Sequence, residues 1–285
     1  MFVSRQNTIA REFDVTGIGL HSGRPVTVRA FPSNPGKGIT IARAGSAPTR
    51  ISVDRITKSQ LCTRVITLGG PVDTIEHFLA ALSICGIDNI HVEISAGEMP
   101  ILDGSALPWA KAISAAGIVV SDAFRHPLIV TKPFEFTTQE SRFSVQPGAP
   151  WMSVTIDYPG TPIGRQEIAL PWTDSPRLLA ARTFALASEV AALRRAGLGR
   201  GGSLANAVVV GDSGPINTGG LRGQDEYVRH KALDLIGDLY VVGAPIIGRI
   251  QAYRPGHAAN HAFLRAMIRA SVLRRVVPST ETRAA

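Results

Sequence analysis

Strand-like and helix-like hydrophobic patterns follow one another along the chain without a strict strand–helix–strand alternation. This mixture predicts an α+β fold of layered sheets and helices, in preference to a doubly wound parallel sheet. The first half runs from a strand-like region at 2–15 to a helix at 106–116 that ends at Gly117. In the second half we expect strands near 128–146, 151–158 and 246–253, and helices near 176–196, 224–239 and 258–270.

The stretch 121–127 separates the two halves, so we place a boundary at about residue 125, which gives domains 1–125 and 126–285. A weak internal repeat indicates that the halves are similar, because each has an amphipathic helix, then a glycine, then a strand. A shift of 157 residues also places His77 over Asp234. The pairs aligned by this shift are Leu79 with Ile236, Leu82 with Leu239, Gly86 with Gly243 and Ile90 with Ile247.

The segment 73–86 has the pattern of a helix with one buried face. Asp73 followed three residues later by Glu76 is a capping-box-like start, and Gly86 is a natural helix end. The prediction places Glu76 and His77 in the first turn, where the acid has a structural explanation and the histidine has none. The apolar stripe of this helix consists of Ile75, Phe78, Leu79 and Leu82.

The helix predicted at 224–239 carries acidic and histidine side chains along one side. His230 and Asp234 lie one turn apart, so both can coordinate one metal ion. The alternative is a solvated polar face in which the two side chains only contact each other. Adding His77 gives a ligand set that suits zinc and leaves a position open for water. The polar side consists of Glu226, His230, Asp234 and Asp238.

A further histidine, His257, follows the Arg-Pro-Gly sequence at 254–256 in a tight turn before the last helix. Such a histidine can face a cleft and transfer protons near neutral pH, although a surface loop position explains it equally well. Two glycine-rich segments, 16–23 and 197–203, lack the ending of a phosphate-binding loop. We interpret both as tight loops.

Composition narrows the class of protein. The 285 residues are 45% hydrophobic, far too apolar for a disordered chain. No uncharged stretch reaches the ~18 residues of a membrane-spanning helix. The first residues lack the apolar core of a signal peptide, so we expect a cytoplasmic protein. Cys62 and Cys85 fit neither a disulfide framework nor a cysteine zinc site, so we expect free thiols.

The charge of the chain favours anionic partners. Lys and Arg outnumber Asp and Glu by 30 to 22, which gives a formal net charge of +8. Such a surface attracts nucleic acid, anionic lipid or a phosphorylated small molecule. However, the basic residues are dispersed, and aromatic residues are only 6% of the chain, so platforms for stacking single strands are scarce. We therefore expect no nucleic-acid partner.

The motifs of this chain resemble, in order and over nearly its whole length, those of the UDP-3-O-acyl-N-acetylglucosamine deacetylases, the zinc amidases that commit the lipid A pathway. Several separate motifs at matching spacing are more specific than any single histidine cluster. The motifs are TGIGLHSG at 16–23, TIEH at 74–77, EMPILDGSA at 98–106, ARTF at 181–184, GGS at 201–203, DEYVRHKALD at 225–234 and GH at 256–257.

The resemblance implies two similar α+β domains, each a sheet layered with helices, with the active site between them. It also implies a zinc ion bound by His77, His230 and Asp234. The implied substrate is a UDP-linked, acylated amino sugar, which loses its N-acetyl group as acetate. Because its acyl chain comes from a membrane-bound or carrier-bound pool, we expect at most a transient contact with the inner-membrane surface. We also expect a monomer, since two domains can cover each other's apolar faces.

The resemblance further implies roles for residues around the zinc ion. Glu76 would be the general base. His257 would be the general acid or electrostatic residue, oriented by Asp238. Lys231 and Thr183 would assist at the reacting carbonyl. The implied substrate-binding residues are His21, Phe184, Leu186 and Gly202.

Two departures from the family pattern, Gly-Gln at 223–224 and Leu186, fall near the acyl-binding segment and leave the acyl chain length open. Two alternatives also remain open. One is a zinc amidase that acts on a different acyl-amino sugar, and the other is a non-catalytic basic binding module in which the histidine cluster is incidental.

Overall fold

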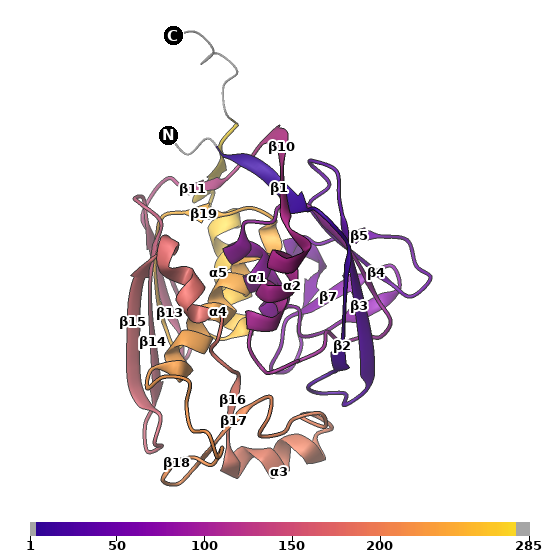
Figure 1. The fold of residues 1–285 in the computed structure, drawn as a ribbon. Helices are drawn as coiled ribbons and strands as arrows, with labels where there is room; N and C mark the ends of the chain where they lie inside the picture. Colours follow the sequence, from indigo (N-terminus) through magenta and orange to yellow (C-terminus); the bar gives the residue numbers. More distant parts are fainter. Residues whose placement is uncertain (1–3, 278–285) are drawn as a thin grey trace.

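The computed structural model describes residues 4–277. Within this range, two five-stranded sheets form opposite sides of the molecule, and the longer helices lie between them (Figure 1). Helices α1 (Glu76–Cys85) and α4 (Glu226–Leu239) pack against each other at the centre. Helix α2 (Leu107–Ala116) packs against α1, and α5 (His257–Arg269) packs against α4. These sheets and helices confirm the predicted α+β class.

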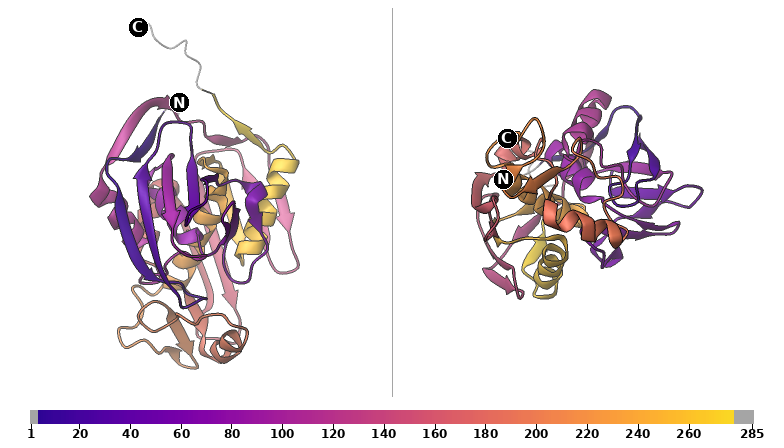
Figure 2. Two further views of the ribbon diagram at one scale, coloured as in Figure 1. Left: turned by 90° about the vertical axis from the view of Figure 1, so that its right-hand side faces the viewer. Right: turned by 90° about the horizontal axis from the view of Figure 1, so that it is seen from below.

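The two large sheets share one topology. The first has the order β2 (Phe13–Ile18), β3 (Pro25–Pro32), β9 (Ile90–Ile94), β4 (Ile39–Arg43), β5 (Thr49–Arg50), and faces the viewer in the left view of Figure 2. The second has the order β12 (Phe134–Thr137), β13 (Arg142–Gln146), β20 (Arg249–Tyr253), β14 (Trp151–Tyr158), β15 (Gly164–Pro171). In each sheet a strand from later in the chain lies between two hairpins and runs parallel to one neighbour. This strand is β9, parallel to β4, in the first sheet and β20, parallel to β14, in the second. This shared topology accounts for the internal repeat in the sequence.

Smaller sheets complete each half. Within residues 4–277, every strand pairing joins strands inside 5–124 or inside 128–275. The first half adds β1 (Arg5–Ile9) with β10 (Ile118–Phe124), and β6 (Ile56–Thr57), β7 (Arg64–Thr67) and β8 (Gly70–Val72). The second half adds β19 (Ile246–Ile247), β11 (Leu128–Val130) and β21 (Leu273–Arg275), and also β16 (Phe184–Leu186), β17 (Val208–Gly211) and β18 (Gly214–Pro215).

The prediction of a continuous helix at 176–196 is wrong. Residues Trp172–Leu178 form a 3-10 helix, β16 follows, and only Ala187–Arg195 form a helix, α3. Pro176 has no N–H to donate and so disfavours a continuous α-helix, and the apolar residues before α3 pair with β17 instead. Strands β16–β18 and α3 form a lobe at the end of the molecule opposite β1 and β10 (Figures 1 and 2). The strand regions predicted at 128–146 and 2–15 are each divided into shorter strands, and residues 1–3 lie outside the described range.

The capping box predicted at the start of α1 is also wrong. Glu76 is the first residue of the helix, and no side chain caps it. Asp73 instead pairs with Arg64, whose Nε lies 2.5 Å from Asp73 Oδ1. Thr74 has a left-handed φ of 58°, which separates Asp73 from the helix. The predicted apolar stripe is buried, and α1 ends at Gly86 as expected.

The polar side of α4 is buried, so the solvated face considered above is excluded. Glu226, His230, Asp234 and Asp238 are all buried, and α4 packs against α1, α5 and the second sheet. Gly237 allows this close packing, because a Cβ there would lie 2.1 Å from the carbonyl oxygen of Glu76. Polar groups enclosed in this way must be hydrogen-bonded, paired or bound to a metal.

The remaining expectations concern the cysteines and the membrane. Both cysteines are free thiols in the structure, with Cys62 buried and Cys85 half-buried. Among residues 4–277, no helix is long and apolar enough to cross a membrane.

Candidate metal centre and active site

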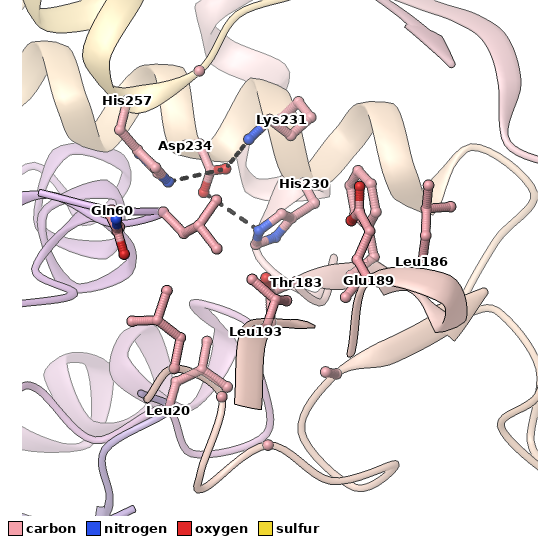
Figure 3. A pocket seen from close by; sticks show the side chains of 18 of the residues that line it. Leu20, Gln60, Thr183, Leu186, Glu189, Leu193, His230, Lys231, Asp234 and His257 are labelled. Carbon is pink, nitrogen blue, oxygen red and sulfur yellow. Dashed lines mark hydrogen bonds and ion pairs between the residues drawn. The ribbon is translucent and has the colours of Figure 1, made fainter. Parts of the chain in front are cut away.

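A cavity of about 1530 Å³ is lined by residues from both halves of the chain (Figure 3). The loop between β2 and β3 and the start of α1 contribute from the first half, and α3, α4 and the start of α5 contribute from the second. One part of the wall carries histidines and carboxylates. Elsewhere the wall is largely apolar, with side chains such as Leu20, Leu186 and Leu193. The cavity can therefore hold a ligand that is partly polar and partly apolar.

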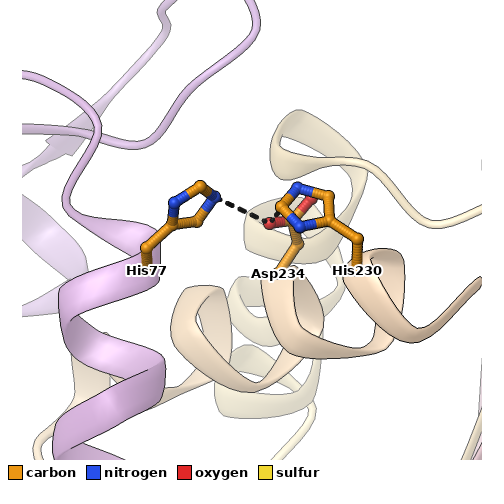
Figure 4. Close-up of side chains that lie close together, drawn as sticks. All are labelled: His77, His230 and Asp234. Atoms are coloured by element: carbon orange, nitrogen blue, oxygen red, sulfur yellow. Dashed lines mark ion pairs between the residues drawn. The ribbon is translucent and has the colours of Figure 1, made fainter. Parts of the chain in front are cut away.

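Three donor side chains meet in this wall. His77 from α1 and His230 and Asp234 from α4 each offer a ligand atom, and these atoms all lie within 4.8 Å of one another (Figure 4). Nε2 of His230 lies 3.4 Å from Asp234 Oδ1, and Nε2 of His77 lies 3.7 Å from the same oxygen. The packing of α1 on α4 thus assembles the cluster.

The protonation states of the three side chains suit a cation. Burial and the neighbouring His230 lower the pKa of His77 to about 3, and burial also lowers the pKa of His230. Burial alone would raise the pKa of Asp234, but His230 and Lys231 outweigh it and hold that pKa well below its usual value. Near neutral pH the cluster therefore offers two neutral imidazoles and one carboxylate.

Two features of the cluster, one contact and one oxygen that is unpartnered within residues 4–277, fit a divalent metal. His230 Nδ1 lies 3.1 Å from the carbonyl oxygen of Ala181, so Nδ1 carries the proton and Nε2 is left with a free lone pair. Asp234 Oδ1, which faces both imidazoles, is buried and has no hydrogen-bond partner among the described residues. A buried carboxylate oxygen without a donor is costly unless a cation neutralises it. The three residues therefore fit a metal ion.

Glu76 and His257 face each other beside this cluster. His257 Nε2 lies 3.8 Å from Glu76 Oε1 and 3.9 Å from Asp234 Oδ2. Burial raises the pKa of Glu76 to about 8. Burial would lower the pKa of His257, but Asp238, Glu76 and Asp234 outweigh it and raise the pKa to about 9. The pair can therefore accept and donate protons near neutral pH.

Asp238 lies behind His257 on α4. Its Oδ2 accepts hydrogen bonds from His257 Nδ1 and from Asn260 Nδ2, both at 2.8 Å. Because Nδ1 is used in this bond, Nε2 is the nitrogen that His257 presents to Glu76 and Asp234. Burial would raise the pKa of Asp238, but His257 and His261 outweigh it and hold the pKa well below its usual value.

Lys231 and Thr183 also lie in the cavity wall. Lys231 Nζ donates to Asp234 Oδ2 at 2.9 Å; burial would lower its pKa, but Asp234 outweighs burial and raises it. The N–H of Thr183 donates to the Gly104 carbonyl, and the Thr183 carbonyl accepts from the N–H of Val208, both at 2.8 Å. Both residues are held in place at the edge of the cluster (Figure 3).

The four residues predicted to bind substrate all line the cavity, although they come from separate segments. Phe184 contacts the rings of Tyr158, Tyr227 and His230 edge-on, so it forms the wall next to the metal ligands. The N–H of His21, in the loop between β2 and β3, donates to Glu98 Oε1 at 2.7 Å, and burial lowers the pKa of the His21 imidazole. The four residues are His21, Phe184, Leu186 and Gly202.

Two features of the site were missed by the sequence analysis. Tyr158, at the end of β14, lines the cavity, and no sequence pattern marked it. Glu226 is fully buried and accepts hydrogen bonds from Arg182 Nε at 2.8 Å and Nη2 at 3.0 Å. This pair fixes the start of α4 against the segment that carries Thr183. The sequence contains a basis for predicting this pair, because Arg182 directly precedes Thr183 and Glu226 lies one helical turn before His230.

Two imidazoles and a carboxylate beside a carboxyl–imidazole pair, at the meeting of two α+β halves, define a metal-dependent hydrolase. The family model described as UDP-3-O-acyl N-acetylglycosamine deacetylase matches residues 6–269. The chain therefore belongs to the UDP-3-O-acyl N-acetylglycosamine deacetylase family, and the non-catalytic binding module is rejected.

Similar proteins carry the same description. UDP-3-O-acyl-N-acetylglucosamine deacetylases of Citrifermentans bemidjiense, Myxococcus xanthus and Neisseria gonorrhoeae are 39%, 38% and 38% identical to this chain. The alignments cover 93%, 96% and 92% of this chain and 89%, 90% and 90% of those proteins. The similarity thus extends over both halves and over every segment that contributes to the cavity.

Proposed function

We propose that this chain hydrolyses the N-acetyl group of UDP-3-O-acyl-N-acetylglucosamine and releases acetate, the committed step of lipid A biosynthesis. The observation that carries the proposal is the His77–His230–Asp234 cluster beside Glu76 and His257, in a cavity with both polar and apolar walls. Membership of the deacetylase family supports the choice of an amide bond. The alternative, a different acyl-amino sugar, requires the same chemistry and is separated by substrate tests.

The metal in this proposal is zinc, held by His77, His230 and Asp234. Two nitrogen ligands and one oxygen ligand suit zinc and leave a coordination position open. When bound, such an ion lowers the pKa of a water molecule toward ~7 and polarises a carbonyl group.

Glu76 and His257 move the protons. The Glu76 carboxylate takes the proton of the attacking water, because Glu76 lines the cavity directly before the metal ligand His77. His257, protonated through its contacts with Asp238 and Glu76, gives a proton from Nε2 to the departing amine. General acid–base groups of this kind typically contribute 10²- to 10⁴-fold to the rate.

Lys231 and Thr183 stabilise the oxygen of the reacting carbonyl as it gains negative charge. Lys231 is positively charged and held next to the cluster by Asp234. The Thr183 hydroxyl lies on a backbone fixed on both sides. Donors that are already in place do not have to reorganise during the reaction. Phe184, Leu186, Gly202 and His21 would contact the acyl chain and the sugar.

We also propose how the chain is organised and where it acts. Domains 1–125 and 126–285 are supported by strand pairings that stay on one side of residue 125. The chain would act as a cytoplasmic monomer that touches the inner-membrane surface transiently, because its substrate carries an acyl chain and its net charge is +8.

The test is acetate release from UDP-3-O-acyl-N-acetylglucosamine by the purified chain. Glu76→Gln should lower kcat by 10²- to 10⁴-fold. Glu93→Gln is the matched control, because Glu93 lies on β9 outside the cavity and about half of its side chain is exposed. Full turnover by Glu76→Gln would contradict the role of the base. Equal turnover of a substrate without the UDP group would favour the alternative amino sugar.

A further inference from the structure

Thr63 contacts both sides of the proton-transfer pair from a single position. It lies directly before β7, in the first half of the chain, and is fully buried. Its N–H donates to Glu76 Oε2 at 2.9 Å. Its hydroxyl donates to Asp238 Oδ1 at 2.5 Å, and the other oxygen of Asp238 holds His257. One residue thus joins the proposed base to the carboxylate that orients the proposed acid.

The direction of the hydroxyl bond follows from its neighbours. An ionised carboxylate can only accept, so the Thr63 hydroxyl must donate to Asp238. His261 Nε2 lies 3.3 Å from Thr63 Oγ1 and 3.5 Å from Asp238 Oδ1. Since the Thr63 proton is already used, the His261 nitrogen carries the proton that faces this pair of oxygens. The Asp238 carboxylate therefore has donors on both oxygens, and it cannot rotate without losing one of them.

We propose that Thr63 is a positioning residue for the hydrolysis, because it fixes Glu76 directly and His257 through Asp238. The inference rests on the roles proposed above for Glu76 and His257. Thr63 comes from the first half of the chain and Asp238 from the second, 175 residues later. The hydroxyl bond therefore sets how the base from α1 and the acid from α5 face each other across the cluster.

The experiment removes the hydroxyl and keeps the shape. Thr63→Val should lower kcat by about 10- to 100-fold, the usual cost of removing a partner that orients a site residue. KM should stay within about twofold, because Thr63 does not line the cavity. Thr63→Ser, which restores the donor, should recover kcat to within about threefold of the wild type. The matched control is Thr67→Val, since Thr67 is buried on β7 but its hydroxyl donates to the Gly70 carbonyl.

A double-mutant cycle separates positioning from a structural effect. In a His257→Ala background, Thr63→Val should cause little further loss of kcat, because the group that it positions is already absent. A general structural effect would lower kcat by the same factor in both backgrounds. Bound metal and unfolding temperature are measured for every variant. If Thr63→Val does not fold, Thr63→Ala gives the same comparison.

Three results would overturn the inference. The first is a kcat for Thr63→Val equal to that of Thr67→Val. The second is an equal loss in Thr63→Ser and Thr63→Val, and the third is an undiminished loss in the His257→Ala background. The proposed function is tested separately: normal turnover by His257→Ala alone would overturn the role of His257 and this inference with it. Impaired His257→Ala together with normal Thr63→Val would overturn only the positioning role.

Discussion

At the scale of single residues, the neighbours of a buried carboxyl decide what it can do. Glu76 and Asp234 are both almost fully buried in the same wall. Burial raises the pKa of Glu76 to about 8, whereas His230 and Lys231 outweigh burial and hold the pKa of Asp234 well below its usual value. One carboxyl is thus suited to exchange protons and the other to remain a ligand.

We predict a bell-shaped pH dependence of kcat/KM. The acid limb comes from protonation of Glu76 and the alkaline limb from deprotonation of His257. Burial raises the pKa of Glu76 to about 8, and the surrounding carboxylates raise the pKa of His257 to about 9. A bound divalent cation lowers both pKa values, so the acid limb should lie at or below about pH 8 and the alkaline limb at or below about pH 9. His257→Gln should lose the alkaline limb. A His257→Gln profile with the same alkaline limb as the wild type would contradict the assignment.

At the scale of elements, the site depends on how closely α1 approaches α4. Gly237 leaves room for the Glu76 carbonyl, and the Arg182–Glu226 pair fixes the start of α4. Neither of these two contacts could be predicted from the spacing of hydrophobic residues along the sequence. The 3.6-residue pattern correctly placed Glu226, His230, Asp234 and Asp238 on one side of α4. It could not show that this side is buried, because burial is decided by α1 and α5, which are distant in sequence.

Gly237→Ala should destabilise the protein and lower turnover. In an open helix, Gly to Ala is stabilising by about 1 kcal/mol. Here the new Cβ would lie 2.1 Å from the Glu76 carbonyl oxygen, so α1 and α4 must move apart at the residue that carries the base. Overpacking of this kind typically costs about 1–3 kcal/mol. Denaturant unfolding together with kcat checks this, and a more stable variant with normal kcat would refute the close approach.

Glu226→Gln should destabilise the protein by about 3–5 kcal/mol at pH 7, because it leaves the positive charge of Arg182 buried without a negative charge to neutralise it. Burial would raise the pKa of Glu226, but hydrogen bonds from Arg182 and Arg222 outweigh it and lower the pKa. A lowered folded-state pKa adds stability above the pKa of the unfolded carboxyl, and this stability is lost as the pH falls through the folded value. The difference between wild type and variant, measured by urea unfolding, should therefore shrink below about pH 4. A constant difference down to pH 2 would contradict this.

At the scale of the whole molecule, two halves of shared topology place their helices back to back, and the site forms where these helices meet. The repeated arrangement was visible in the sequence as a spacing of 157 residues between α1 and α4. The contacts that complete the site were not visible. Thr63 meets Asp238 across 175 residues, and Arg182 meets Glu226 across 44. Tertiary packing, which local sequence patterns do not show, brings such partners together. The prediction of a helix at 176–196 was wrong for the same reason, because the spacing of apolar residues could not show that β16 pairs with β17.

The charge and the cavity predict different responses to salt and to acyl length. The net charge of +8 attracts the anionic diphosphate of the substrate, and salt screens this attraction. Raising the ionic strength should therefore raise KM with little change in kcat. Shortening the acyl chain should cost affinity at any salt, by roughly 0.8 kcal/mol for each buried methylene. Equal kcat/KM for a two-carbon ester and a long acyl chain would contradict binding of the chain beside Phe184 and Leu186.

The most direct test of the central claim is the metal content of the purified chain. If His77, His230 and Asp234 hold the metal, elemental analysis should find about one divalent ion per wild-type chain and almost none in His230→Ala. His91→Ala, which removes a histidine on β9 outside the cavity, should keep the full content. A folded His230→Ala protein that retains one ion per chain and full acetate release would contradict the account.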